Sequence, residues 1–359
     1  MARPVIHHRT PEFSAVLDSA RERLKPLFGT RQEVILLASS GTGAMEAAVA
    51  NLLEPEDHAV FVNGGKFGER WGKLISAHGA IAHEIKVEWG RSVHPEQVDD
   101  ALRAAPSAQA VFVQASETST GALHPIAEIG EVARTRGVML VVDGITSVGV
   151  FEQKMDEWGV DALVTGSQKA LMLPPGLAMI ALSQQALAHA RESRAPRYYF
   201  DLLRELKAQR DEHTTAYTAA VALVFALNKA LDLIYAETLP RVFARQLLMA
   251  EATRAAALVL GLRIFPDHPA PGVTAMVTPE GIDSSKLIRY MRDELGVSVQ
   301  GGQDQMKGRL LRIGHMGYLA PFDMLIAVGA LEVALSKAGH GFESGTGVAA
   351  VQARINQGI

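Results

Sequence analysis

The first half of the chain alternates short apolar runs, often β-branched, with longer stretches of helical periodicity. These runs lack polar alternation, which is typical of strands in a parallel sheet that helices cover on both faces. We therefore predict an α/β fold with a mostly parallel, seven-stranded sheet. The expected strands are residues 34–37, 58–62, 80–87, 110–114, 138–142, 162–165 and 178–181, and helices are expected at 42–53, 68–78 and 126–136.

The pattern changes after about residue 236, where a long helical segment at 239–260 precedes shorter elements. We expect strands at 262–265, 273–277, 297–299 and 310–313, and helices at 284–295 and 322–338. This mixture predicts a large domain at 1–236, which includes the N-terminal segment, and a smaller α+β domain at 237–359. The glycine-rich tail that begins at Gly339 is expected to be loosely held.

Composition and charge exclude several classes of function. The 359 residues include no cysteine, which excludes disulfides, thiolate metal sites and cysteine nucleophiles. The net charge of -4 comes without a basic block, so nucleic acid is not an expected partner. No apolar run approaches the ~20 residues that span a bilayer. Because the first residues also lack the apolar core of a signal peptide, we expect a cytoplasmic protein without a membrane partner.

Small residues follow the first predicted strand, in the sequence VILLASSGTGAMEAA at residues 34–48. Ser40, Gly41 and Thr42 would open a helix, where backbone N–H groups favour an anion. The segment is therefore a candidate phosphate site, although a tight turn without a ligand explains it equally well on its own. A dinucleotide site is disfavoured because Glu46 replaces the third glycine of the usual pattern, and the lysine of a P-loop is missing.

Two charged residues follow later predicted strands. Asp143 ends the apolar run VMLVVD, and Lys169 follows another strand in GSQKALMLPPG. A lone aspartate in such a place is more often a cap or an ion-pair partner, and a lone lysine is usually a solvated charge. Beside a phosphate site, however, the pair favours a different interpretation. Asp143 would keep a ring nitrogen protonated, and Lys169 would be a partly desolvated, neutral amine that forms an imine with an aldehyde.

These motifs resemble those of the class V, fold-type I aminotransferases, which depend on pyridoxal 5′-phosphate (PLP), and most of all the alanine/serine–glyoxylate branch. The resemblance covers nearly the whole chain. It is most specific in GSQKALMLPPG at residues 166–176 and in LLRIGHMGY at residues 310–318, and the spacing from Asp143 to Lys169 is also similar. The resemblance implies the fold-type I architecture and PLP as the cofactor.

The resemblance also implies a role for each residue of the site. Lys169 would hold the cofactor as a Schiff base and then move a proton, while Asp143 would pair with the pyridine nitrogen. Arg312 would bind the α-carboxylate of the substrate with its forked guanidinium. The other implied cofactor contacts are Ser40, Gly41, Thr42 and Gln168 at the phosphate, Phe67 and Ile145 on the two ring faces, Thr118 at the phenolic oxygen, and Thr218 at the phosphate of the neighbouring subunit in a homodimer.

The activity implied by the resemblance is ping-pong transfer of an amino group from alanine or serine to a 2-oxo acid such as glyoxylate or pyruvate. One alternative is another class V transamination, either ureidoglycine–glyoxylate or aspartate-linked. The aspartate-linked reaction needs a second cation, for which Arg9, Arg70 and Arg309 are candidates. A second alternative is a non-catalytic subunit of a larger assembly, which the intact Lys169 and Arg312 disfavour. The missing cysteine excludes a desulfurase, and the broken glycine pattern disfavours an NAD-dependent dehydrogenase.

The twelve histidines do not indicate a metal site. His7 and His8 are adjacent in sequence, and no pair of histidines has helical ligand spacing, so we expect solvated or core histidines and no metal. Members of the branch usually carry a Gly/Pro-rich segment ahead of the stretch at residues 4–13. We therefore expect either a longer start or a substrate pocket that is completed differently.

Overall fold

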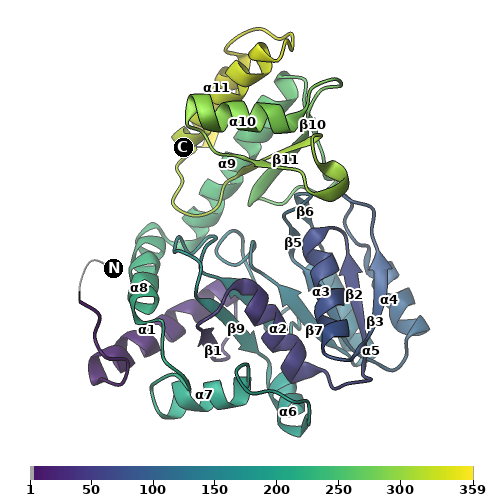
Figure 1. Ribbon diagram of the computed structural model, residues 1–359, viewed down its shortest axis with the longest axis vertical. Helices are drawn as coiled ribbons and strands as arrows, with labels where there is room; N and C mark the ends of the chain where they lie inside the picture. The colour runs from purple at the N-terminus through teal and green to yellow at the C-terminus, as the bar shows by residue number, and fades with distance from the viewer. Residues whose placement is uncertain (1–3, 359) are drawn as a thin grey trace.

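Two main β-sheets organise the part of the chain that the computed structural model describes, residues 4–358 (Figure 1). The larger sheet has the strand order β1-β9-β8-β7-β4-β2-β3, and its strands are parallel except for β9. These strands are β1 (Val34–Leu37), β2 (His58–Asn63), β3 (Ile81–Lys86), β4 (Ala108–Gln114), β7 (Met139–Asp143), β8 (Ala162–Gly166) and β9 (Ala178–Leu182). The prediction of a mostly parallel, seven-stranded sheet is confirmed.

Helices cover both faces of this sheet because the strand side chains alternate between two buried apolar clusters. Val60 and Val62 of β2 belong to one cluster, and Ala59 and Phe61 belong to the other. The first cluster includes residues of α1 (Pro11–Phe28), α4 (Pro95–Ala104), α5 (Ile126–Arg136) and α8 (Val221–Glu237). The second includes residues of α2 (Gly41–Leu52), α3 (Lys66–Ala77), α6 (Gln184–Glu192) and α7 (Leu202–Asp211). The three helices predicted in this half are α2, α3 and α5.

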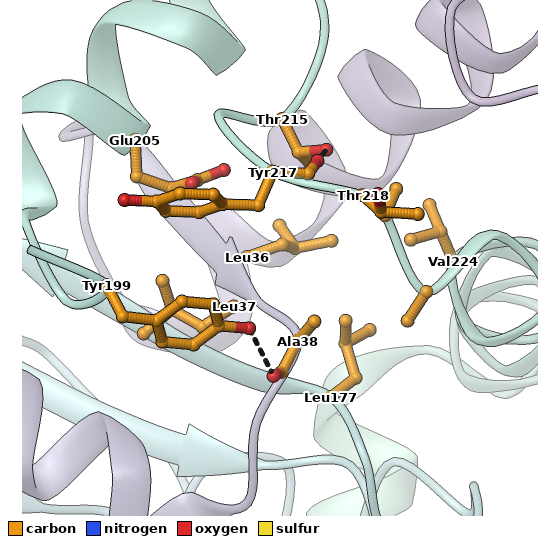
Figure 2. A pocket seen from close by; sticks show the side chains of 12 residues that line it. Leu36, Leu37, Ala38, Leu177, Tyr199, Glu205, Thr215, Tyr217, Thr218 and Val224 are labelled. Atoms are coloured by element: carbon orange, nitrogen blue, oxygen red, sulfur yellow. Dashed lines mark hydrogen bonds between the residues drawn. The ribbon is translucent and has the colours of Figure 1, made fainter.

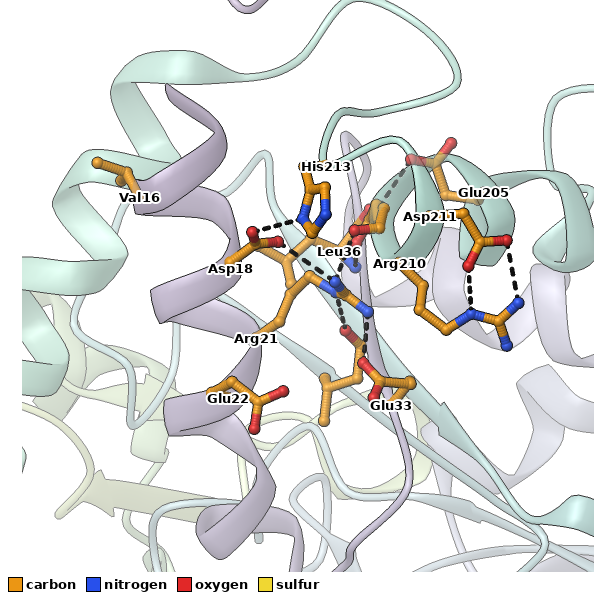
Figure 3. A network of polar contacts seen from close by, with 12 residues as sticks. Val16, Asp18, Arg21, Glu22, Glu33, Leu36, Glu205, Arg210, Asp211 and His213 are labelled. Carbon is orange, nitrogen blue, oxygen red and sulfur yellow. Dashed lines mark hydrogen bonds and ion pairs between the residues drawn. The ribbon is translucent and has the colours of Figure 1, made fainter. Parts of the chain in front are cut away.

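The edge strand β1 is held by side chains on its open side. Gln209 of α7 accepts a hydrogen bond from the Leu36 N–H (3.1 Å) and donates one to the Leu36 carbonyl (2.6 Å). Arg21 of α1 donates to the Gln209 carbonyl (2.7 Å) and to the Glu33 carboxylate (2.5 Å) (Figure 3). These contacts cover the edge of the sheet and fix the strand that leads to Ser40.

The second sheet is antiparallel and has the order β10-β11-β13-β12. Its strands are β10 (Arg263–Ile264), β11 (Val273–Val277), β12 (Gln300–Gly301) and β13 (Leu310–Gly314), and η1 (Asp304–Met306) lies before β13. It packs with α9 (Leu239–Val259), α10 (Ser284–Leu295), α11 (Pro321–Lys337) and α12 (Thr346–Gly358). The strand expected at 297–299 lies at β12 instead, because α10 ends at Leu295 with Gly296 as its C-cap and the chain pairs with β13 only from Gln300. The domain division at 236/237 stays a prediction.

The tail is where the expectation was wrong. Most of this tail forms α12 (Thr346–Gly358), which lies against α9 and buries Val351 and Ile355 in the apolar cluster of the second sheet. Glu332 of α11 accepts hydrogen bonds from the N–H groups of Gly345 (2.9 Å) and Val348 (3.0 Å), which caps the start of α12. Between residues 4 and 358, no helix is both long and apolar enough to cross a membrane.

Candidate active site

Most of the predicted site residues gather at one edge of the larger sheet. Asp143 is the last residue of β7, and it lies between Gln114 of β4 and Val164 of β8 in the strand register. Lys169 follows β8, and Ser40 follows β1. Because parallel strands end at the same edge, the segments that follow them converge there, as is usual for ligand sites of open α/β sheets.

The N-terminus of α2 is shaped to receive an anion. Ser40 is its N-cap residue and its side chain makes no capping hydrogen bond, while the first amides of a helix have no intrahelical acceptor. A Cβ atom at Gly41 would lie 2.5 Å from the Ile145 side chain, so glycine permits this close approach. A Cβ at Gly166 would lie 2.9 Å from Gln168 Oε1 and 3.4 Å from Gly41 Cα. The geometry therefore brings four of the predicted cofactor residues together.

Asp143 is a buried carboxyl group with an unusual proton affinity. Its Oδ1 accepts a hydrogen bond from the Ile145 N–H at 2.8 Å. Burial raises the pKa of Asp143 to about 7, and the negative charge of Glu117 also raises it, while the Ile145 hydrogen bond and the positive charges of Arg70 and Lys169 oppose the rise. A cationic hydrogen-bond donor would therefore bind strongly to the ionised form of this carboxylate.

Lys169 and Arg312 form the cationic part of the site. Burial lowers the pKa of the Lys169 amine, the charge of Arg312 lowers it further, and Asp143 opposes both effects. Arg312 comes from β13 of the second sheet, and its Nε donates to the Gly301 carbonyl (3.0 Å). Its Nη1 donates to the carbonyl of Thr118 (2.5 Å) in the hairpin of β5 (Ser116–Glu117) and β6 (Ala122–Leu123). Arg312 therefore links the second sheet to the β5–β6 hairpin at the site.

The aromatic residue of the site, Phe67, lies in the first turn of α3. The guanidinium of Arg70 stands over its ring, 5.0 Å from the centroid, and Arg70 Nη1 donates to Thr42 Oγ1 at 2.9 Å. Three arginines were considered as a second cation. Arg70 is the one that contacts predicted site residues, Thr42 and Phe67, whereas Arg9 and Arg309 are exposed.

Glu117 is a residue of the site that the sequence reasoning missed. It is fully buried, and its Oε2 accepts hydrogen bonds from the N–H groups of Phe67 (3.1 Å) and Gly68 (2.8 Å). Its Oε1 accepts from the N–H (3.1 Å) and the hydroxyl (2.6 Å) of Ser119. The available signal was a single acidic residue among small polar residues directly after a buried strand.

Thr218 lies away from this cluster, in the loop between α7 and α8. Its exposed side chain lines a pocket with β1 residues and with Tyr199, whose hydroxyl donates to the Ala38 carbonyl at 3.2 Å (Figure 2). Ala38 is two residues before Ser40, so this pocket lies on the approach to the start of α2. Within one subunit, the structure does not bring Thr218 to the other predicted cofactor residues.

Comparison with known proteins supplies the family. The sequence model of the aminotransferase class-V family matches residues 2–316. The small subunit of a soluble hydrogenase from Synechococcus sp. is 39% identical, over 96% of this chain and 91% of the relative. The serine–glyoxylate aminotransferase of Methylorubrum extorquens is 34% identical, over 98% of this chain and 90% of the relative.

A solved structure agrees with the sequence relatives. The ureidoglycine–glyoxylate aminotransferase of Bacillus subtilis superposes with a TM-score of 0.95 at 28% identity, over 99% of this chain and 93% of that one. The resemblance inferred from the motifs around Asp143, Lys169 and Arg312 is thereby confirmed, and so is the fold class. The chain belongs to the class V aminotransferase family and is a transaminase.

Proposed function

We propose that the protein is a PLP-dependent aminotransferase that moves the amino group of a small L-amino acid, alanine or serine, to a 2-oxo acid such as glyoxylate or pyruvate. One observation carries the proposal: a buried carboxyl, Asp143, and an amine with a lowered pKa, Lys169, lie at one edge of the larger sheet, and Arg312 of the second sheet lies near enough to lower the pKa of Lys169 further. A site that combines these three groups suits amino acid chemistry on an aldehyde cofactor.

The residues of the site fit PLP. The first amides of α2 and the side chains of Ser40 and Thr42 offer donors to a phosphate group. The Asp143 carboxylate can accept a hydrogen bond from a protonated pyridine nitrogen, which relieves its unfavourable burial. Phe67 and Ile145 belong to the same cluster and can cover the two faces of a flat ring. We therefore propose the complete set of contacts that the family resemblance implies, including Thr118 at the phenolic oxygen and Gln168 at the phosphate.

Each side chain then has a defined task in the reaction. When bound, PLP supplies an aldehyde carbon for the amino group and a ring that withdraws electrons. Asp143 holds a proton at the ring nitrogen, and Arg312 orients the donor by binding its α-carboxylate. Lys169 Nζ, whose pKa burial lowers, removes the α-proton as the general base. The same groups serve the acceptor in the second half-reaction, so the kinetics are ping-pong.

We further propose a homodimer in which Thr218 reaches the phosphate of the neighbouring subunit. Support comes from the position of Thr218 in an exposed loop beside Tyr199, at a pocket that borders the end of β1 (Figure 2). Tyr198, which is 74% exposed, also lies next to this loop, with its ring centroid 6.0 Å from that of Tyr217. The cytoplasmic location stays a prediction.

Two of the alternatives can be compared with the geometry. An aspartate-linked reaction would need a second cation, and Arg70, which donates to Thr42 and stands over the Phe67 ring, is the one candidate that lies among the site residues. Arg9 and Arg309 are exposed and lie outside the cluster of site residues. A non-catalytic subunit would have no need of a lysine and an aspartate with shifted pKa values at one strand edge.

The first test is an absorbance spectrum of the purified protein with PLP. We expect a visible band near ~420 nm, typical of a PLP imine, which L-alanine or L-serine converts to a band near ~330 nm, and which glyoxylate then restores. The rates with the two donors rank them, and L-aspartate serves as the comparison. A protein that shows no visible band even with excess PLP, or whose band no amino acid moves, would contradict the proposed function.

Arg312 gives a second prediction. Arg312→Lys keeps a positive charge but loses the fork that holds a carboxylate, so we expect KM for L-alanine to rise about 10- to 100-fold, the size of one or two lost charge-assisted hydrogen bonds. Steady-state kinetics measure this effect. Arg309→Lys, at an exposed position on the approach to the same strand, should leave KM unchanged. Equal KM values for both variants would remove Arg312 from the carboxylate site.

A further inference from the structure

Helix α3, which carries Phe67, begins without a capping side chain of its own. Its N-cap residue is Gly65, which has no side chain to accept hydrogen bonds from the first amides of the helix. Those amides belong to Lys66, Phe67 and Gly68. An uncapped start would leave the aromatic residue on a helical turn that frays easily.

The β5–β6 hairpin provides the missing cap. Ser119 Oγ accepts a hydrogen bond from the Lys66 N–H (3.0 Å), and Glu117 Oε2 accepts from the N–H groups of Phe67 (3.1 Å) and Gly68 (2.8 Å). Ser119 also donates to Glu117 Oε1, so the two capping side chains hold each other. All three amides of the first turn therefore bond to this hairpin, which lies beside α3 (Figure 1).

The local sequence is adapted to this contact. A Cβ atom at Gly65 would lie 2.6 Å from Glu117 Cδ and 2.4 Å from Ser119 Oγ. A Cβ at Gly68 would lie 2.5 Å from the Val62 carbonyl oxygen. Glycine at position 65 thus allows the carboxylate to approach the start of α3 closely, and glycine at position 68 allows this turn to approach the end of β2.

Glu117 also acts on the charged groups of the site. Burial raises the pKa of Glu117 itself, and the hydrogen bonds that it accepts from Ser119, Gly68 and Phe67 oppose this rise. When ionised, Glu117 favours the protonated form of Asp143 on β7 and the charged form of Arg312 on β13. The other groups that act on the Asp143 carboxyl are Arg70 from α3, Lys169 after β8 and the N–H of Ile145. Glu117 is the only negative charge among them, and removing it should lower the pKa of Asp143.

We infer that Glu117 is a positioning residue of the proposed PLP site. Its carboxylate fixes the first turn of α3, and with it the ring of Phe67, relative to Asp143. In its ionised form, Glu117 also adds to the preference of Asp143 for a proton, which burial dominates. The inference rests on the proposed function for its consequences on PLP, but the capping role stands on the protein alone.

The test variant is Glu117→Gln, with Glu332→Gln as a matched control. Glutamine is nearly the same size as glutamate but carries no charge, and its NH₂ group must face either the N–H groups of Phe67 and Gly68 or the N–H of Ser119. In either orientation it cannot accept all the hydrogen bonds that the carboxylate accepts. Glu332 is also a buried glutamate that caps a helix, since its carboxylate accepts hydrogen bonds from two backbone N–H groups. The helix that it caps, α12, packs in the apolar cluster of the second sheet. The pair therefore separates the loss of a buried helix cap from an effect on the site.

Hydrogen exchange of the cofactor-free protein, measured by mass spectrometry, reports on the cap without PLP. We expect the segment 64–70 to exchange about tenfold faster or more in E117Q, as loss of hydrogen bonds to a charged acceptor predicts. E332Q should instead speed up exchange at 345–350. Unchanged exchange at 64–70 in E117Q would overturn the capping role, whether or not the protein binds PLP.

The affinity for PLP, measured by absorbance across pH, tests the second half of the inference. We expect E117Q to bind PLP about tenfold more weakly at neutral pH. Because Asp143 pairs with the ring nitrogen only when ionised, affinity falls at low pH, and this fall should move to lower pH in E117Q. E332Q should leave both the affinity and the pH profile unchanged. An E117Q profile identical to that of the wild type, or an equal shift in E332Q, would overturn the positioning role.

The outcomes remain distinct from failure of the proposed function. A wild-type protein that does not bind PLP contradicts the proposed function, while the exchange data still decide the capping role. If E117Q does not fold, Ser119→Ala replaces it, because this variant keeps the carboxylate and removes the bond to the Lys66 N–H. Faster exchange at 64–70 with weaker PLP binding in S119A supports the inference, and unchanged values of both overturn it.

Discussion

Replacing Lys169 with alanine is expected to lower kcat for amino transfer by about 10⁴-fold, the upper range for a lost general base. The lysine has two proposed tasks, since it holds the cofactor and removes the α-proton of the donor. Burial and the charge of Arg312 lower the pKa of its amine, so a larger fraction is neutral near pH 7 than for a solvated lysine. Single-turnover absorbance changes with L-alanine measure this loss directly.

A small amine added to the solution tests whether the missing group is a base. Methylamine or ethylamine can enter the space that the side chain leaves in Lys169→Ala and accept the proton in its place. We expect partial recovery of the rate that rises with amine concentration and with pH. The matched control is Lys73→Ala, which removes an exposed lysine of α3 and should keep the wild-type rate. More than about a tenth of the wild-type rate in Lys169→Ala without added amine would contradict the proposed role.

Much of the fold could be predicted because most strands of the larger sheet, though not the edge strand β3, are buried on both faces. Continuous apolar runs such as 139–142 have no polar alternation, and their positions along the chain agree with the structure. The position of Asp143 and Lys169 at strand ends follows from the same pattern, since the segments after parallel strands meet at one edge. The roles of these two residues came from the family resemblance and are still proposals.

The parts that could not be predicted depend on contacts between distant segments. Nothing in the sequence around Phe67 indicates that Glu117, which is far along the chain, caps its helix. The helix α12 has few strong signals of its own and gains its order by packing Val351 and Ile355 against α9. Both features are tertiary, and local propensity cannot reveal them. The same reason explains why Arg70 could not be distinguished from Arg309 on sequence alone.

Asp143→Asn is expected to lower kcat by about 10³-fold, while it stabilises the cofactor-free protein at neutral and alkaline pH. The loss of rate follows because neutral asparagine cannot stabilise the positive charge of a protonated ring nitrogen. An ion pair in contact is worth about 4 kcal/mol at an effective dielectric constant near 20, which corresponds to about three orders of magnitude in rate. The side-chain oxygen of the asparagine can still accept the hydrogen bond that the Ile145 N–H donates, so the local backbone should not change.

The gain in stability follows from the sign of the pKa shift. Burial raises the pKa of Asp143 from 3.8 to about 7, so the folded, cofactor-free protein binds a proton there that the unfolded chain has already released. The free energy of unfolding therefore falls as pH rises between these two values, by at most about 4 kcal/mol. Asparagine has no such dependence. Above pH 7 the variant should melt several degrees higher than the wild type, and below pH 4 the two should melt together.

Thermal melts without PLP at several pH values, together with kcat of the PLP-loaded protein, measure both effects. Adding PLP should reverse the order of stability, because the cofactor offers Asp143 the cationic partner that the empty site lacks, whereas the neutral asparagine of the variant gains no such ion pair.

The exposed Asp211→Asn serves as the control and should change neither quantity. A variant that loses activity without gaining stability would mean that Asp143 is ionised at little cost in the empty site. A variant that gains stability but keeps its activity would mean that the ring nitrogen needs no carboxylate partner. Only the two effects together would show that ionised Asp143 destabilises the cofactor-free protein and that its charge is needed when the cofactor is bound.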